Sequence, residues 1–113
     1  MTRRDRERLT DVLDAIDAIR SHLDRGDLSD GLVFDAVRLR LIEIGEAAKG
    51  LTPVRTGSEP DVPWDDIAGM RDWLAHRYSD TSHAIVQAIV EEDLPKLEAA
   101  VRRMQQRAEA GDR

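Results

Sequence analysis

Residues 30–51, DGLVFDAVRLRLIEIGEAAKGL, decide the predicted fold. Their apolar side chains recur at alternating steps of three and four residues, as on one face of a helix that packs in a bundle. The members of this stripe are Phe34, Val37, Leu41, Ile44, Ala48 and Leu51. A second apolar strip on the same helix consists of Leu32, Leu39 and Ile42. A helix with two apolar strips is either central in its bundle or shared with another chain.

The sequence on both sides of this helix keeps the helical period. In the preceding segment the amphipathic pattern stops at Gly26, which is expected to end a first helix, and Ser29 or Asp30 can cap the second. Residues 52–61, TPVRTGSEPD, contain two prolines and no period, so we expect a loop there. Further helices are expected to start at Pro63, after Ser79-Asp80-Thr81 and at Asp93-Leu94-Pro95.

The composition agrees with a helical protein. Charged residues make up 35% of the 113 residues and aromatic residues only 4%, and the chain lacks the β-branched and aromatic runs that form strands. Seventeen basic and 23 acidic residues give a net charge of −6. The sequence therefore predicts one acidic domain over residues 1–113, with an all-α fold in the form of an antiparallel four-to-five-helix bundle.

Several classes of site are excluded by residue content. Without cysteine, the chain can form neither disulfides nor thiolate metal sites. It has no phosphate-loop motif, and His22, His76 and His83 do not have metal-ligand spacing, so neither a metal nor another cofactor is expected. No stretch approaches the ~20 apolar residues of a membrane span, and the basic N-terminus leads into no apolar signal core. We therefore expect a cytoplasmic protein without a membrane partner.

One short stretch, residues 70–80 (MRDWLAHRYSD), concentrates side chains that can carry chemistry. Within it, Asp72 and His76 are one helical turn apart and can pair, which would orient the imidazole. Arg71 and His76 differ by about 140° on a straight helix. They can therefore reach one ligand only if the helix ends near His76 or if a second copy of the chain completes the site. Tyr78 follows two residues later.

The charge pattern leaves two interpretations of this stretch open. Residues 59–93 contain nine acids and only two bases, Arg71 and Arg77. Local carboxylates can neutralise both arginines and leave His76 as a surface residue. Alternatively, bases from other helices form a rim for a polyanion. The candidates are Arg38, Arg40 and Lys49 on the second helix, or Arg102, Arg103 and Arg107 on the last.

Gly45 and Glu46 in the second helix bear on the same question. A glycine in a helix costs stability, so Gly45 predicts that another helix approaches closely there. Glu46 is either a surface acid or a neighbour of the site, depending on whether this face lines a cleft.

Residues 71–78 resemble the R-x-x-x-x-H-x-Y signature of HepT-like ribonuclease toxins, which belong to the wider HEPN superfamily of helical nucleases. Arg71, His76 and Tyr78 match its arginine, histidine and tyrosine. Asp72 stands where the family often has asparagine, and it adds a negative charge beside a phosphate site. The likeness extends from about Asp30 to Met104. It includes the blocks IGEAAK (44–49), PWDDIAGM (63–70) and EDLPKL (92–97).

The resemblance implies a homodimer in which two motifs face a shared cleft, and metal-independent cleavage of RNA, such as tRNA or mRNA. Arg71 would hold the scissile phosphate, His76 would transfer protons, and Asp72 would support the site. It also implies a type II toxin–antitoxin system. Its antitoxin would be a minimal nucleotidyltransferase that transfers AMP to Tyr78, which would also contact the phosphate.

Two other functions remain open on the residues alone. The acidic stretch at 59–93 fits a non-catalytic helical dimer that binds a nucleotidyltransferase or is modified by it. A structural adaptor, with Arg71 and His76 in surface ion pairs, is the third possibility.

Overall fold

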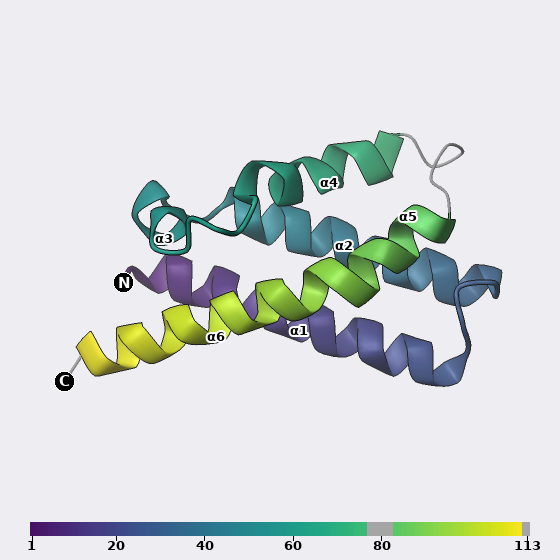
Figure 1. The fold of residues 1–113 in the computed structure, drawn as a ribbon, viewed down its shortest axis with the longest axis horizontal. Helices are drawn as coiled ribbons and strands as arrows, with labels where there is room; N and C mark the ends of the chain where they lie inside the picture. Colours follow the sequence, from purple (N-terminus) through teal and green to yellow (C-terminus); the bar gives the residue numbers. More distant parts are fainter. Residues whose placement is uncertain (77–82, 112–113) are drawn as a thin grey trace.

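The computed structural model describes residues 1–76 and 83–111, and these are helical almost throughout. The elements are α1 (Arg3–Arg25), α2 (Gly31–Lys49), α3 (Pro53–Gly57), α4 (Trp64–His76), α5 (His83–Ala88), the π-helical turn η2 (Ile89–Asp93) and α6 (Leu94–Gly111). Figure 1 shows that α1, α2, α4 and the joined α5–α6 run in alternating directions. The described residues contain no strand, and the predicted all-α antiparallel bundle is confirmed.

Helix α2 begins and packs as its sequence predicts. Asp30 is its cap, and the side-chain oxygen accepts hydrogen bonds from the backbone N–H of Leu32 at 2.9 Å and of Val33 at 3.3 Å. All six residues of the predicted stripe from Phe34 to Leu51 are buried. In the second strip, by contrast, Leu32 is 83% and Leu39 51% exposed. The second apolar strip therefore lies largely on the surface of this chain.

The predicted loop at residues 52–61 is wrong over Pro53–Gly57, which form the short helix α3. Proline has the backbone geometry of a first helical turn, so Thr52-Pro53 favours a helix start. The buried carboxylate of Asp5 holds Thr52 in place, because it accepts hydrogen bonds from the Thr52 N–H at 3.0 Å and hydroxyl at 2.8 Å. This contact with α1 orders a segment that has no period of its own.

The predicted helix start at Asp93-Leu94-Pro95 agrees with the first residue of α6, Leu94, but no break precedes it, because the chain stays helical from α5 through η2 into α6. A proline inside an α-helix cannot donate a hydrogen bond, and its ring clashes with the carbonyl four residues earlier. The chain accommodates Pro95 by widening the preceding turn, where the Leu94 N–H donates to the Ile89 carbonyl five residues back. The expected cap at Ser79-Asp80-Thr81 lies outside the described residues.

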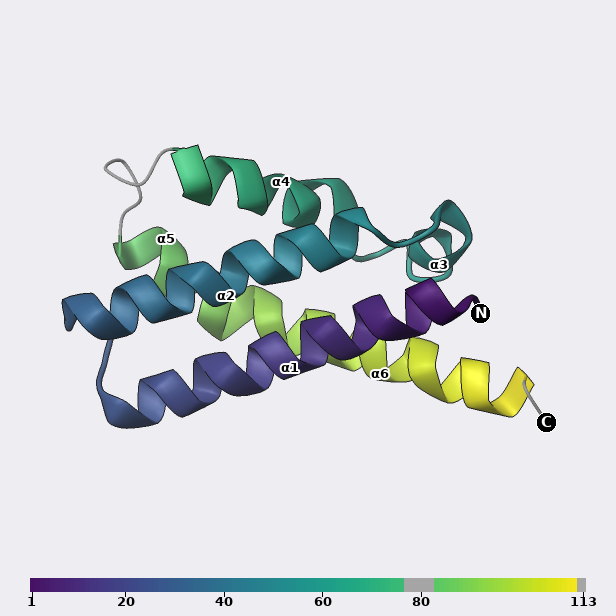
Figure 2. The ribbon, with the colours of Figure 1, turned by 180° about the vertical axis from the view of Figure 1, so that it is seen from behind.

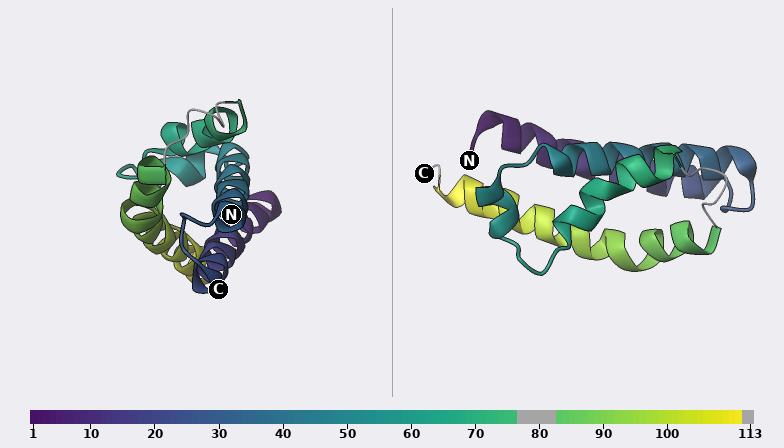
Figure 3. Two further views of the ribbon diagram at one scale, coloured as in Figure 1. Left: turned by 90° about the vertical axis from the view of Figure 1, so that its right-hand side faces the viewer. Right: turned by 90° about the horizontal axis from the view of Figure 1, so that it is seen from above.

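Helix α2 is central in the bundle because it packs against both α1 and α4, and α6 packs against α1. Figure 2 shows α1 and α2 side by side in front of α6, and the right-hand view of Figure 3 shows α4 running along α2. Their buried side chains form one hydrophobic core. Within residues 1–76 and 83–111, no helix is both long and apolar enough to cross a membrane.

Candidate active site

The candidate site begins with the close contact of α2 and α4 at Gly45. A Cβ atom at this position would lie 2.9 Å from both the backbone nitrogen of Arg71 and the carbonyl oxygen of Ile67. Only glycine lets the two helices approach this far without a shift of one backbone. The predicted close approach is confirmed, and it fixes the backbone of Arg71 against α2.

The Arg71 side chain is held between two carboxylates, one from each helix. Its Nε lies 2.5 Å from Oε2 of Glu46 on α2, and its Nη1 lies 2.8 Å from Oδ1 of Asp72 on α4. We call these three residues the Arg71 cluster. The Arg71 side chain is 43% exposed, and the side chains of Glu46 and Asp72 are more exposed still. The cluster is therefore open to solvent, with a formal charge of −1.

The expected pair between Asp72 and His76 is replaced by the bond between Asp72 and Arg71. The guanidinium is always charged, so its hydrogen bond to the Asp72 carboxylate is charge-assisted. His76 is exposed and is the last residue of α4 that the structure describes. Tyr78, the third residue of the predicted motif, lies outside the described residues.

Among the basic residues that the sequence suggests for the rim of the site, Arg38 contacts α4. Its Nη1 donates a 3.0 Å hydrogen bond to the carbonyl oxygen of Leu74, in the turn that leads to His76. The contact crosses from α2 to α4, two helical turns before Gly45 along α2. The sequence indicates Arg38 as a possible residue of this rim, but the helical spacing of residues along α2 does not indicate that it binds the backbone of α4.

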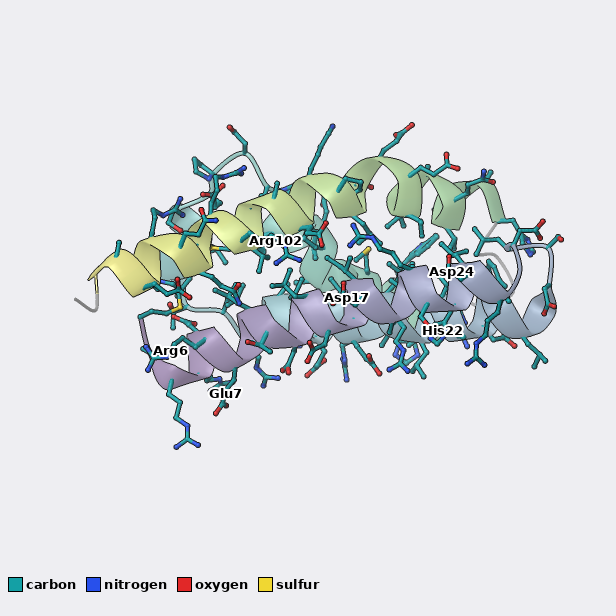
Figure 4. All side chains as sticks on the ribbon, turned by 90° about the horizontal axis from the view of Figure 1, so that it is seen from below. Arg6, Glu7, Asp17, His22, Asp24 and Arg102 are labelled. Carbon is teal, nitrogen blue, oxygen red and sulfur yellow. The ribbon has the colours of Figure 1, made fainter. Side chains whose placement is uncertain are left out.

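The other rim candidates have different partners, apart from Lys49, which is exposed on α2 one turn after Glu46. Arg40 donates from Nε to Nε2 of His22 on α1 at 3.2 Å, and Figure 4 shows where His22 lies on α1. On α6, Arg103 and Arg107 bind Glu59, and Arg102 binds Glu98. Arg103 and Arg107 therefore join α6 to the segment before α4, whereas Arg102 contacts a carboxylate of its own helix.

These contacts lower the pKa values of the carboxyl groups that they surround. The hydrogen bond from Arg103 lowers the pKa of the Glu59 carboxyl, and Arg107 adds to the effect. The hydrogen bond from Arg20, supported by Arg102, lowers the pKa of Glu98 to about 2.

Across the described parts of the chain, no group of three or more histidine and carboxylate side chains is placed to hold a metal ion.

Comparison with known proteins identifies the family. Residues 10–104 match the family described as ribonuclease HepT-like. A protein of Thermococcus cleftensis named as a probable ribonuclease HepT is 30% identical over 101 residues, which cover 86% of this chain and 92% of that protein.

Two further relatives carry names of candidate RNases. One, from Caldanaerobacter subterraneus subsp. tengcongensis, is 38% identical over 64 residues, and one from Methanocaldococcus jannaschii is 34% identical over 64 residues. These matches cover 57% and 56% of this chain, and the chain spans only 57% and 59% of the two relatives. No solved structure matches the chain significantly. The match over residues 10–104 and the relative from Thermococcus cleftensis together show that the chain belongs to the ribonuclease HepT-like family.

Proposed function

We propose that the protein is a metal-independent ribonuclease whose catalytic residues are Arg71 and His76. The observation that carries this proposal is the open Arg71 cluster, in which the guanidinium is anchored across the α2–α4 contact and remains accessible. Membership of the HepT-like family and the RNase names of the relatives support the same reaction. In this proposal residues 1–113 act as one HEPN-like domain in the cytoplasm, where the RNA substrate is found.

Arg71 would bind the scissile phosphodiester. A guanidinium donates two parallel hydrogen bonds to a phosphate, and these strengthen as negative charge builds on the phosphorus oxygens. Glu46 and Asp72 hold Arg71 in place before RNA binds. Because the pairs are exposed, each is weak enough for a phosphate to displace. Asp72 would therefore support the free site and give way when RNA binds.

His76 would move the protons. Histidine titrates near neutral pH and can accept or donate a proton at a substrate oxygen. In the proposed step, the ribose 2′-oxygen loses its proton to the imidazole and attacks phosphorus. The bond from phosphorus to the 5′-oxygen then breaks, and that oxygen takes up a proton. A second histidine, from another copy of the chain, can supply this proton.

A homodimer would complete the site, and the exposed strip of α2 is its candidate interface. Leu32 and Leu39 are large apolar side chains in water, and their burial by a second copy would be favourable. Leu39→Glu should shift the protein from dimer to monomer in sedimentation velocity. Val54→Glu, at an apolar residue of α3 that is more exposed than Leu39, is the control. A monomeric wild type would exclude the dimer.

The biological role we propose is that of a toxin in a type II toxin–antitoxin system. A nucleotidyltransferase antitoxin would transfer AMP to Tyr78 and thereby add bulk and negative charge beside the RNA path. Co-expression with such an enzyme should add the mass of one AMP to the peptide that carries Tyr78 and relieve growth inhibition. Persistence of full toxicity together with an unmodified Tyr78 would contradict this role.

A second function, a non-catalytic helical dimer modified by the same enzyme, is favoured by one observation. The Arg71 cluster carries a net negative charge, and residues 59–93 contain nine acids, so RNA meets repulsion near the site. This alternative predicts that purified protein leaves RNA intact while the partner still modifies Tyr78.

The decisive assay is RNA cleavage in the presence of a metal chelator. His76→Ala should reduce the rate about 100-fold or more, because the proton transfer is lost. His22→Ala removes a histidine that α1 holds against Arg40, and it should leave the rate unchanged. Circular dichroism would check that both variants fold. Equal cleavage by the wild type and His76→Ala would refute the assignment of His76.

A further inference from the structure

The bundle has an open seam between α4 and the continuous η2–α6 helix. Helix α4 packs closely against α2, and α6 packs against α1, but α4 and α6 are not a closely packed pair. A groove of about 350 Å³ lies between them. It reaches from residues 61–70 on one side to residues 89–97 on the other, so it is long enough for about two to three helical turns.

The floor of this α4–α6 groove is apolar. Its apolar lining residues are Val62, Pro63, Ile67, Met70, Ile89, Leu94 and Leu97. Ile67, Leu94 and Leu97 belong to the buried core, whereas Met70 and Ile89 are only partly covered. Partly covered apolar side chains between two helices are the usual surface for the apolar face of a third helix.

The rim of the groove carries an excess of acid. Asp61, Asp66 and Asp93 border it, against a single base, Lys96. Asp66 and Asp93 are exposed, and within residues 1–76 and 83–111 neither has an ion-pair partner. Exposed carboxylates around an apolar floor favour a ligand with positive charges beside its apolar face.

We infer that the α4–α6 groove binds a basic amphipathic helix of a protein partner. Apolar side chains at positions i, i+3 or i+4 and i+7 would fill the floor, and lysine or arginine beside them would face Asp66 and Asp93. RNA is disfavoured at this rim by its own charge, and the interface proposed for a second copy of this chain is the exposed strip of α2, not this groove. The inference does not depend on RNA cleavage, because the groove and the Arg71 cluster share α4 but no residue.

The test uses two fluorescent peptides of equal length and the full chain. Both carry leucine at i, i+3, i+4 and i+7, and their polar face is lysine in one and glutamate in the other. Fluorescence anisotropy should show binding of the lysine peptide at least tenfold tighter than that of the glutamate peptide. Asp66→Asn with Asp93→Asn should weaken the lysine peptide about fivefold, as expected for two exposed charge pairs.

Matched variants separate the groove from general attraction to an acidic protein. Asp14→Asn with Asp24→Asn removes the same charge from exposed positions on α1, where Figure 4 shows Asp24, and should change binding less than twofold. Ile89→Lys places a charge in the groove and should abolish binding. Ile85→Lys, one turn earlier and outside the groove, should not.

Three results would overturn the inference. Equal binding of both peptides would remove the role of the acidic rim. Equal weakening by the α1 and groove variants would show that only net charge matters. Dissociation of a wild-type dimer by Ile89→Lys, seen in sedimentation velocity, would show that a second copy occupies the groove.

Discussion

The Arg71 cluster and the Glu59 cluster, which consists of Glu59, Arg103 and Arg107, contain the same kinds of side chain in opposite arrangements. At Glu59, two guanidiniums from α6 surround one carboxylate whose side chain is only 10% exposed, with ion-pair distances of 2.7 Å and 2.8 Å. Glu98 repeats this pattern with Arg20 of α1 and Arg102 of α6. At Arg71, two exposed carboxylates surround one exposed guanidinium.

The difference separates structural ion pairs from a site that can exchange partners. A shielded carboxylate with two arginines has no room for another ligand, and its burial would become costly if a partner were lost. The arginines of both clusters are about half exposed, so the carboxylates make the difference. Those around Arg71 are exposed and weakly paired, and a phosphate can take their place. The same chemistry therefore joins elements at Glu59 and Glu98 and presents a cation at Arg71.

The largest expected effect comes from removing the central cation. Arg71→Ala should reduce RNA cleavage about 100- to 1,000-fold, because the main stabiliser of the transition-state charge is lost. Arg103→Ala should lower the unfolding temperature and leave the rate per folded molecule unchanged. Single-turnover cleavage and thermal unfolding of both variants measure the contrast. A loss of activity that only follows the loss of folded protein would count against the distinction.

Gly45→Ala should have the next largest effect. Its Cβ would lie 2.9 Å from the backbone of α4, so the helices must separate, at a cost of about 1–3 kcal/mol in the free energy of unfolding. Gly69→Ala is the control, because a Cβ there meets nothing within 4 Å, and it should stabilise the protein by about 0.5–1 kcal/mol. Urea denaturation tests both, and equal changes at the two glycines would rule out tight packing at Gly45.

Glu59→Gln and Glu46→Gln should differ in what they change. Glu59→Gln should destabilise the protein by about 1–2 kcal/mol, because two arginines lose a shielded partner. Glu46→Gln should change stability by less than about 0.5 kcal/mol, since the pair is exposed. It should also lower KM for RNA, because one competitor of the phosphate is gone. Chemical denaturation and steady-state kinetics test the pair, and an unchanged KM would show that Glu46 does not compete.

The smallest effect is a pH dependence from Glu98. Its pKa is about 2 in the folded protein against an ordinary value of 4.5, so its stabilising contribution is complete above pH 4.5. The contribution is lost as the pH falls from 4.5 towards 2, and it amounts to about 1 kcal/mol because water screens both half-exposed arginines. Glu98→Gln should remove this part of the acid dependence. An identical pH profile for the two proteins would contradict the shift.

The fold could be predicted from the sequence wherever a long apolar period dominates. The stripe of α2 and the cap at Asp30 are examples. Helix α3 was missed because its order depends on Asp5, a residue about 50 positions earlier. The break that the sequence predicts in the helix before Pro95 does not occur, because the backbone forms a wider, π-helical turn there and the helix continues.

The candidate site was predictable in its members but not in its bonds. Gly45 indicated the close approach of another helix, and the motif indicated Arg71 and His76. The charge pattern left open that local carboxylates neutralise Arg71, and the pair with Asp72 agrees with that interpretation. The choice of Arg71 over His76 as the partner of Asp72 depends on the conformation of the Arg71 side chain, which helical spacing does not determine. The pairing of Glu46 with Arg71 likewise requires the relative rotation of α2 and α4, which spacing within each helix does not determine.

The central claim is that Arg71 exchanges a carboxylate for a phosphate whereas Arg103 does not. NMR of the arginine Nε–H groups, assigned with Arg71→Lys and Arg103→Lys, tests it during titration with a DNA dinucleotide, which offers a phosphodiester without a 2′-hydroxyl. We predict a saturable shift of the Arg71 signal and a constant Arg103 signal. A constant Arg71 signal, or equal shifts of both signals, would contradict the account.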